Sequence, residues 1–571
     1  MRPVLLGGLL VLSAGQARAQ EEEEDHARRR WEWFYQQRAY PFGTIPAGAL
    51  ERARVQLEGL RRPLFGAVPP PISGTRWQAI GPRAIPTSGT SIGRISTVAI
   101  HPTNTNLLYV GGAQGGVWRS TDGGSNWTAL TDKECSLAMG AIVLDPVNPA
   151  IVYAATGEQH FSADSYYGCG VLRSVDGGNT WTRLGASVFV RSRISRLVIL
   201  PSTAGTVATT TILAASDNGL FRSLDGGANW VLVRAGTATD LVMDPSNERT
   251  LYVAIRTQGV FRSVDGGATW GALGAGFPTA SLGRINITIS ASSPSRLYAS
   301  LHNLSNSALL GILTTTDAGA TWTQLPATGA SCGTQCWYDM FIAVHPTNPN
   351  TIYFGGVGLF RSLDGGSTFS SIGNTIHVDQ HYLAFDPVNA QRIYVTNDGG
   401  IYRSDNGGTT WTSLNAGLEL TQFYGGISLH PSEQAIVLGG TQDNGTLRYS
   451  NNPTWAAVLG GDGGFTAINY DNPVIQFAET QWTAGSTSSG PRRSDGGGFV
   501  RKVNGIVTSE PALFIPPLVM DPVNAQVLYF GTNRVYRTAD AAESWTPVSP
   551  VLVTTTGAVS AIAPAAGDPG T

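Results

Sequence analysis

Three ionisable side chains in the stretch NTIHVDQHYLAFDP have a spacing that could do chemistry. His377, Asp379 and His381 stand at every second position, so on a β-strand they would point to the same side. Imidazole and carboxylate groups in this arrangement are typical of a metal site or of a polar network beneath a ligand. They are equally typical of a hydrogen-bonded plug where a ring of strands closes. All three interpretations stay open, but the metal site is the least favoured of them. We therefore predict no cofactor and no bound metal.

Acidic residues also stand in three glycine-rich turns. Asp398 lies in VTNDGGIY, Asp443 in GGTQDNGTL beside Gln442, and Asp462 in LGGDGGFTA. Asp-Gly pairs form turns for local reasons, but two carboxylates also carry the acid and base steps of glycoside hydrolysis. We therefore predict Asp443, Asp398 and Asp379 as catalytic candidates. Gln442, Asp462, His377 and His381 are predicted to contact substrate.

Other candidates lie in loops at equivalent places of the sequence. Glu479 stands in FAETQW, and the loops HFSADSYYGCG and CGTQCWYDM offer Tyr166, Tyr167 and Trp337. Flat aromatic rings stack on sugar faces, and a loop braced by Cys332 and Cys336 would hold Trp337 outward at low entropic cost. Packing of these rings against a neighbouring loop is the alternative.

A repeated turn indicates the elements that must position these residues. RSVDGGNTWTRL at 173 recurs as RSTDGGSNWTAL at 119, RSLDGGANWVLV at 222, RSVDGGATWGAL at 262 and RSLDGGSTFSSI at 361. Each copy follows two short apolar runs, the first of which ends in His-Pro or Asp-Pro. Four short strands in a period of roughly 40 to 55 residues are typical of a propeller blade. The sequence therefore predicts an all-β fold, a β-propeller of four-stranded blades.

The pattern Ser-x-Asp-x-Gly-x-Thr-Trp resembles the Asp-box, or BNR repeat, of sialidases, sortilin-type receptors and tandem-propeller xyloglucan-degrading glycosidases. The resemblance covers the chain from about residue 77 and implies that Asp122, Asp176, Asp225 and Asp265 serve folding. Counting copies predicts a seven-bladed propeller over 75–416 and the start of a second one over 417–571. The alternative is a single ten-bladed ring like that of sortilin. The last residues read as the first strand of another blade, so we expect the chain to be a fragment.

The xyloglucan-degrading glycosidases provide the closest resemblance in layout. Their second propeller opens as GLELTQFYGGISLHPSEQAIVLGGTQDNG does here, which implies that Asp443 is the general acid. Their general base lies in the first blade, where this chain has Gln114, and an amide cannot accept a proton as a base must. Asp398 or Asp379 would have to supply the missing carboxylate. A sialidase would need an Arg-Ile-Pro segment, whereas Arg94 stands in GRIST.

Two functions follow as hypotheses. The first is a secreted, glycosyl-hydrolase-like propeller that acts on or binds a polysaccharide at the cleft between the two propellers. The alternative is a non-catalytic, sortilin-like propeller that binds glycans or protein segments. Two carboxyl groups about 5 to 10 Å apart in an open cleft would favour the enzyme.

Composition limits the partners. The chain has 571 residues, a formal net charge of −3 and no basic run, so we expect that it binds no nucleic acid. We also expect it to be a monomer. Residues 1–19 have the pattern of a secretory signal peptide, and no later segment is apolar enough to span a membrane. Residues 20–74 read as an N-terminal arm with an amphipathic helix around Leu50–Leu60. Outside the cell the four cysteines can pair, Cys135 with Cys169 and Cys332 with Cys336, although other pairings are equally compatible with the sequence.

Overall fold

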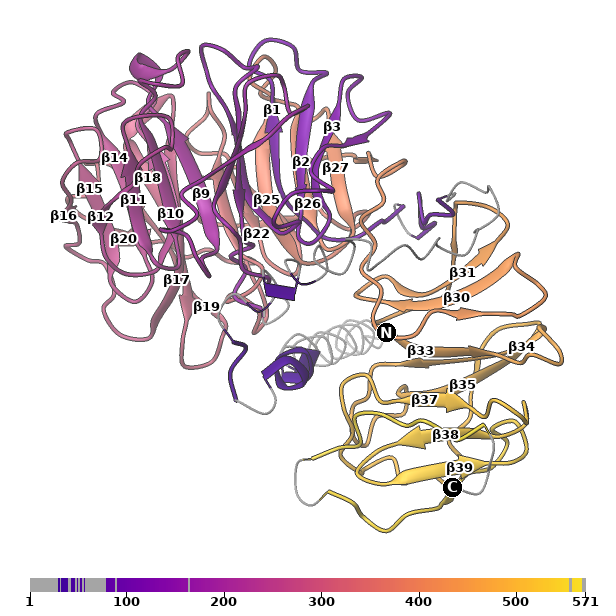
Figure 1. The fold of residues 1–571 in the computed structure, drawn as a ribbon. Helices are drawn as coiled ribbons and strands as arrows, with labels where there is room; N and C mark the ends of the chain where they lie inside the picture. The colour runs from indigo at the N-terminus through magenta and orange to yellow at the C-terminus, as the bar shows by residue number, and fades with distance from the viewer. Residues whose placement is uncertain are drawn as a thin grey trace, which may run out of the picture. The chain divides into compact units, whose positions relative to one another are not determined.

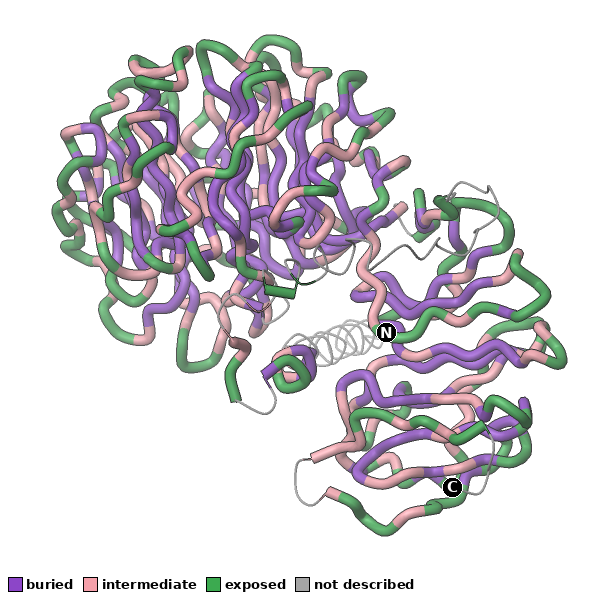
Figure 2. The backbone as a smooth tube through the Cα atoms, in the orientation of Figure 1, coloured by how far each residue is buried: buried purple, intermediate pink, exposed green. Residues whose placement is uncertain are grey.

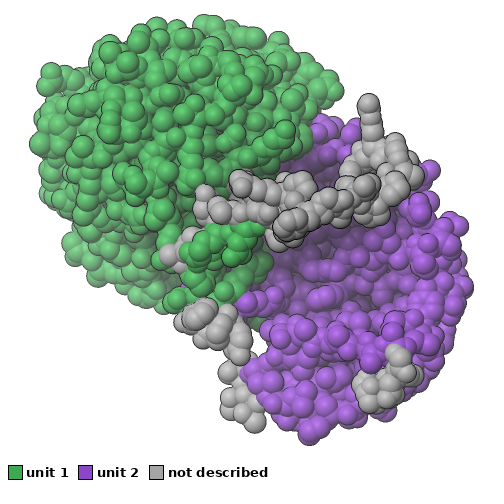
Figure 3. All heavy atoms as spheres, in the orientation of Figure 1, with its two compact units in different colours: residues 1–31, 38–57, 94–415 green, residues 32–37, 58–93, 416–571 purple. Residues whose placement is uncertain are grey.

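A computed structural model of the chain describes residues 29–30, 32–39, 43–46, 49, 52–53, 56, 79–87, 90–162, 165–553 and 557–566. The chain divides into two compact units, residues 1–31, 38–57 and 94–415, and residues 32–37, 58–93 and 416–571 (Figure 3). The described strands form ten four-stranded antiparallel sheets (Figure 1). The predicted fold class, a β-propeller of four-stranded blades, is confirmed. Within the described residues, none of the helices has the length and apolar character needed to cross a bilayer.

The first unit contains seven blades, each of four strands in chain order. Blades one and two are β1 (Ile95–Ile100), β2 (Leu108–Gly112), β3 (Gly116–Ser120), β4 (Thr128–Ala129), β5 (Met139–Leu144), β6 (Val152–Thr156), β7 (Val171–Ser174) and β8 (Thr182–Leu184). Blades three and four are β9 (Ile194–Ile199), β10 (Ile212–Ser216), β11 (Gly219–Ser223), β12 (Val231–Arg234), β13 (Ala238–Met243), β14 (Leu251–Ile255), β15 (Gly259–Ser263) and β16 (Gly271–Ala272), with a 3₁₀ turn η1 (Pro201–Thr203) after β9. Blades five to seven are β17 (Leu282–Ser290), β18 (Ser293–Asn303), β19 (Leu309–Thr315), β20 (Thr323–Gln324), β21 (Phe341–Val344), β22 (Ile352–Gly355), β23 (Leu359–Ser362), β24 (Ser370–Ser371), β25 (Gln380–Phe385), β26 (Ile393–Asn397), β27 (Gly400–Ser404) and β28 (Thr412–Ser413).

The second unit contains three blades. Their strands are β29 (Ser428–Leu429), β30 (Ile436–Thr441), β31 (Gly445–Ser450), β32 (Ala456–Leu459), β33 (Gly463–Ile468), β34 (Ile475–Thr480), β35 (Gly490–Asp495), β36 (Val500–Arg501), β37 (Leu518–Met520), β38 (Leu528–Gly531), β39 (Val535–Thr538) and β40 (Thr546–Pro547). Residues 79–93 belong to this unit, although they precede the first ring in sequence. Ala84 pairs in parallel with Thr454, and Ile85 packs in a core with Trp455.

The blades form because their strands carry continuous apolar sequence. β2 (LYVGG), β6 (VYAAT) and β14 (LYVAI) are buried at every position, which suits a strand covered on both faces by neighbouring blades. The outermost strands are short and exposed, as in β16 and β24. Figure 2 shows buried stretches along the strands and exposed turns between them.

The repeated turn joins each blade to the next one. Tyr109 in β2 and Arg119 in β3 both donate hydrogen bonds to the carbonyl of Gly177, at 2.9 and 2.7 Å. Tyr353 and Arg361 bind the carbonyl of Gly407 in the same way. The repeated Tyr and Arg therefore attach one blade to the turn of its neighbour.

Within each turn the Asp carboxylate satisfies local donors. Asp176 accepts hydrogen bonds from Ser174, from the backbone N–H of Asn179 and from both the N–H and hydroxyl of Thr180. The hydroxyl of Thr180 is the largest of the causes that lower the pKa of Asp176. Asp122, Asp225 and Asp265 bind in the same manner. The predicted folding role of these carboxylates is confirmed.

The ring of the first unit closes between its first and seventh blades. β1 packs against β25 and β26 as well as against β5. Trp127, after the turn of blade one, donates its indole N–H to the carbonyl of Leu414 in blade seven at 2.9 Å. Gly124 has a φ of +93°, and a Cβ there would lie 2.8 Å from the Leu414 side chain. The seam therefore requires glycine at this turn.

The predicted N-terminal features are only partly described. Residues 29–30 and 32–39 are helical, a helix that the sequence interpretation did not include. Residues 49, 52, 53 and 56 are also helical, but the apolar positions Leu50, Val55, Leu57 and Leu60 lie outside the described residues, as do residues 1–19.

Candidate functional site

The candidate residues of the first unit gather at one end of its innermost strands. Asp379 and His381 stand at the start of β25, and Asp398 lies in the turn between β26 and β27. At the same end of the innermost strands lie Arg94 at the start of β1, Glu158 and His160 after β6, and Tyr338 before β21. All of these side chains are buried. The blades thus bring together charged groups that are far apart in the sequence.

The predicted alternation of His377, Asp379 and His381 is wrong. Asp379 has a φ of +60°, and β25 begins only at Gln380, so residues 377–379 form a turn. The carbonyl of His377 accepts hydrogen bonds from the side chains of Gln380 and Asn397, at 2.6 and 2.9 Å. His381 enters the network of the ring centre, and a carboxylate oxygen of Asp379 lies within 4.8 Å of one of Asp398.

Asp398 is held by hydrogen bonds to His381 and Tyr338. Nε2 of His381 lies 2.5 Å from its Oδ1, and the Tyr338 hydroxyl donates to its Oδ2 at 2.7 Å. Burial alone would raise the pKa of Asp398, but the hydrogen bond from His381 together with the charges of Arg94 and Arg30 outweigh burial and lower it. Asp398 is therefore an ionised, fully enclosed carboxylate.

Arg94 links this carboxylate to a second one. Its Nη1 donates to the Tyr338 hydroxyl at 2.6 Å, and its Nε lies 3.0 Å from Glu158, with both side chains of this ion pair fully buried. Nδ1 of His160 lies 3.0 Å from the same Glu158 oxygen. The rings of His160 and His381 stack with their centroids 4.1 Å apart and their planes 10° apart.

The two stacked imidazoles are held neutral. Burial lowers the pKa of His160 well below its usual value, and the charges of Arg284 and Arg94 act in the same direction. Burial also lowers the pKa of His381, outweighing the opposite effect of Asp398. A further positive charge beside Arg94 and Arg284 is thereby avoided.

We expect the free energy of unfolding to fall as the pH drops below about 6.5, the ordinary pKa of histidine. The unfolded chain takes up protons on His160 and His381 that the folded ring excludes, so their stabilising contribution is present above that pH and is lost below it. Thermal unfolding of the full chain between pH 8 and pH 5 measures the slope. His160→Gln should flatten it, whereas His101→Gln, at a partly exposed turn, should not. An unchanged slope in His160→Gln would contradict this account.

In the second unit, Asp443 occupies the turn between β30 and β31. It has a φ of +59°, is half-buried, and donates its backbone N–H to Oδ1 of Asp462 at 2.9 Å. Asp462 is buried and also accepts from the Tyr424 hydroxyl at 2.8 Å. Gln442 is buried, and its N–H donates to the carbonyl of Gln422. The turn thus fixes the backbone of Asp443, and the residue as a whole is half-buried, with its carboxylate Oδ2 enclosed.

Glu479 does not reach an accessible surface. It is fully buried in β34 and accepts a hydrogen bond from the N–H of Phe465 at 3.0 Å. Burial raises its pKa well above the usual range, so the group is protonated. Its prediction as a substrate contact is wrong, because no substrate atom can approach a side chain that is enclosed in the blade.

The aromatic candidates differ in exposure. Tyr167 is exposed and has the guanidinium of Arg193 4.7 Å from its ring centre, whereas Tyr166 is half-buried. Trp337 is half-buried against Tyr338, with ring centroids 5.6 Å apart, rather than held outward as predicted. The cysteines pair as Cys135–Cys169 and Cys332–Cys336. Gln114 is half-buried in the turn between β2 and β3.

Sequence reasoning missed the arginines of the ring centre. Arg284 and Arg196 lie near the starts of β17 and β9, and Arg284 donates to the carbonyl of Tyr338. Arg196 forms an ion pair with Asp240 in β13 at 2.8 Å. The sequence does contain a pattern that could have indicated these residues. Polar residues recur at the starts of the innermost strands, which are otherwise apolar.

Known proteins resemble parts of this chain. No family model matches it. A xyloglucanase of Hypocrea jecorina is 29% identical over 197 residues, which cover 32% of this chain and 22% of that protein. A xyloglucanase of a Paenibacillus species is 32% identical over 179 residues, covering 28% of this chain and 16% of that protein. The match thus spans about a fifth of the length of these curated relatives.

Similarity in structure extends further along the chain. The crystal structure of an ancestral GH74 enzyme aligns with a TM-score of 0.61 at 17% identity, over 84% of this chain and 72% of that one. A sequence identity of this level supports a shared architecture but not a shared chemistry. The likeness shows the fold: this chain is a β-propeller protein built in the manner of a GH74 enzyme.

Proposed function

We propose that the protein acts on a polysaccharide of the β-glucan class, with xyloglucan as the first candidate, and that Asp443 is its general acid. The observation that carries the assignment is the turn between β30 and β31. Of the three residues predicted as catalytic, Asp443 is half-buried whereas Asp379 and Asp398 are buried, and its backbone N–H is bound by Asp462. A general acid must reach the glycosidic oxygen from a fixed position.

The local identity to xyloglucanases supports the choice of substrate class. Secretion is part of the proposal. Residues 1–19 have the pattern of a signal peptide, and both disulfides of the described chain fit an oxidising compartment.

A second candidate function is polysaccharide binding without hydrolysis. Gln114 favours it, because the resemblance implies a carboxylate at that place and an amide cannot act as a base. Asp398 cannot readily replace that carboxylate, since His381 and Tyr338 occupy its oxygens.

One experiment separates the two candidates. The full chain is incubated with xyloglucan, mixed-linkage β-glucan and cellulose, and both reducing-end release and retention on the insoluble polymer are measured. We expect release from xyloglucan, with a smaller effect on cellulose. Retention without release would establish a binding propeller, and neither retention nor release on any of the three would contradict the proposal. Asp379→Asn, run in parallel, tests the remaining predicted carboxylate.

A further inference from the structure

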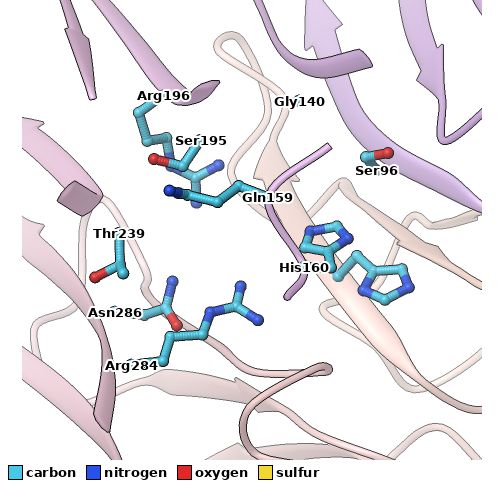
Figure 4. A pocket seen from close by; sticks show the side chains of 10 residues that line it. Ser96, Gly140, Gln159, His160, Ser195, Arg196, Thr239, Arg284 and Asn286 are labelled. Carbon is cyan, nitrogen blue, oxygen red and sulfur yellow. The ribbon is translucent and has the colours of Figure 1, made fainter. Parts of the chain in front are cut away.

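The centre of the first ring contains a small polar cavity, which we call the axial pocket. Six of the seven blades contribute to it, through Ser96, Gly140, Gln159, His160, Ser195, Arg196, Thr239, Arg284, Asn286 and His381. Its free space is that of about one water molecule. Figure 4 shows the guanidinium groups of Arg196 and Arg284 on its wall, with the imidazole of His160 opposite. The pocket lies wholly within the first unit.

Arg284 is the unexplained residue of the axial pocket. It is 5% exposed, and its Nη1 donates to the carbonyl of Tyr338. Among the described residues, its Nε has no hydrogen-bond partner and its guanidinium has no ion pair. Burial lowers the pKa of Arg284 to about 10; the more distant charge of Asp240 opposes this shift, and the charge of Arg196 adds to it. A buried cation of this kind needs a counter-charge.

Among the described residues, none of the neighbouring carboxylates forms a direct ion pair with Arg284. Asp240 lies 2.8 Å from Arg196 and also accepts the N–H of Ile287 at 3.0 Å. Burial raises the pKa of Asp339 well above the usual range, which disfavours its charged form. Glu158 is engaged by Arg94. The guanidinium groups of Arg196 and Arg284 therefore both line the pocket, but of the two it is Arg196 that is directly paired with a carboxylate, Asp240.

We propose that the axial pocket binds a small monovalent anion, which Arg284 and Arg196 hold. Its size admits a halide or the end of a small carboxylate, and excludes an anion as large as gluconate. The unpartnered hydroxyl of Ser96 is a further donor on its wall. The anion would neutralise Arg284 and tie together the starts of β9 and β17, so that it stabilises the ring without taking part in polysaccharide chemistry.

Thermal unfolding of the full chain tests the proposal. Sodium chloride, sodium bromide and sodium acetate are compared with sodium gluconate at constant ionic strength, because gluconate is too large for the pocket. A ligand that binds only the folded chain raises the Tm with its concentration. We expect a rise of at least about 2 °C that saturates. A response to the halides alone indicates an inorganic ion, and an equal response to acetate indicates a carboxylate ligand.

Variants distinguish the pocket from general salt effects. Arg284→Gln should abolish the rise, while Arg234→Gln, whose side chain contacts Phe261 and Gln258 outside the pocket, should retain it. An equal rise in wild type and Arg284→Gln, or no rise in wild type, would overturn the proposal. Should Arg284→Gln fail to fold, wild-type crystals grown in sodium bromide decide the matter. An anomalous peak between the two guanidinium groups supports the site, and its absence refutes it.

Discussion

Replacing Glu158 with glutamine is expected to destabilise the first ring by about 3–5 kcal/mol, because it leaves Arg94 buried without its counter-ion. Both side chains of the pair are fully buried, with Nε of Arg94 3.0 Å from Glu158. Glu158 also lies 3.0 Å from Nδ1 of His160, so the change removes two contacts. Urea unfolding of the full chain, followed by fluorescence, measures the loss.

Two further variants make the test specific. Asp132→Asn, at an exposed residue of the same unit, should change the free energy of unfolding by less than about 0.5 kcal/mol. Replacing Arg94 and Glu158 together by methionine should recover part of the loss, since neither charge is then left unpaired. A loss below about 1 kcal/mol in Glu158→Gln, as for a surface ion pair, would contradict this account.

Asp443→Asn is expected to lower reducing-end release from xyloglucan by about 10²- to 10⁴-fold, the usual contribution of a general acid. Asparagine has the shape of aspartate and tolerates a left-handed backbone, so it suits the φ of +59° at this turn. The backbone N–H that binds Asp462 is unchanged. We therefore expect folding and polysaccharide retention to be preserved.

The matched control for this loss is Asp471→Asn. Asp471 is an exposed acidic residue of the same unit, in the loop between β33 and β34. Its replacement should leave release unchanged. Full activity in Asp443→Asn, or equal losses in the two variants, would remove Asp443 from the proposed mechanism.

The blade architecture could be predicted because its signals are local. Each repeated turn carries its own Ser, Asp and Gly within a few residues, and these residues bind one another in the structure, as Ser174 and Asp176 do. The apolar runs of the strands are also contiguous. The pairing of strands within a blade and the closure of the ring then follow from the number of copies of the repeat.

The centre of the ring could not be predicted in the same way. Arg94 meets Glu158 and Tyr338 across 64 and 244 residues, so nothing in one segment indicates its partners. The alternation from His377 to His381 failed because it assumed a strand where Asp379 has a left-handed backbone. Asp398 was correctly placed in a turn, but its burial depends on His381 and Tyr338 from other segments.

The most direct measurement compares two leaving groups. The kcat/KM of Asp443→Asn relative to wild type is determined on xyloglucan and on a dinitrophenyl glycoside of a xyloglucan oligosaccharide. A dinitrophenolate departs without protonation, whereas a sugar hydroxyl requires an acid. If Asp443 is the general acid, the variant remains close to wild type on the dinitrophenyl substrate and loses about 10²-fold or more on xyloglucan. Equal losses on both substrates would contradict that role.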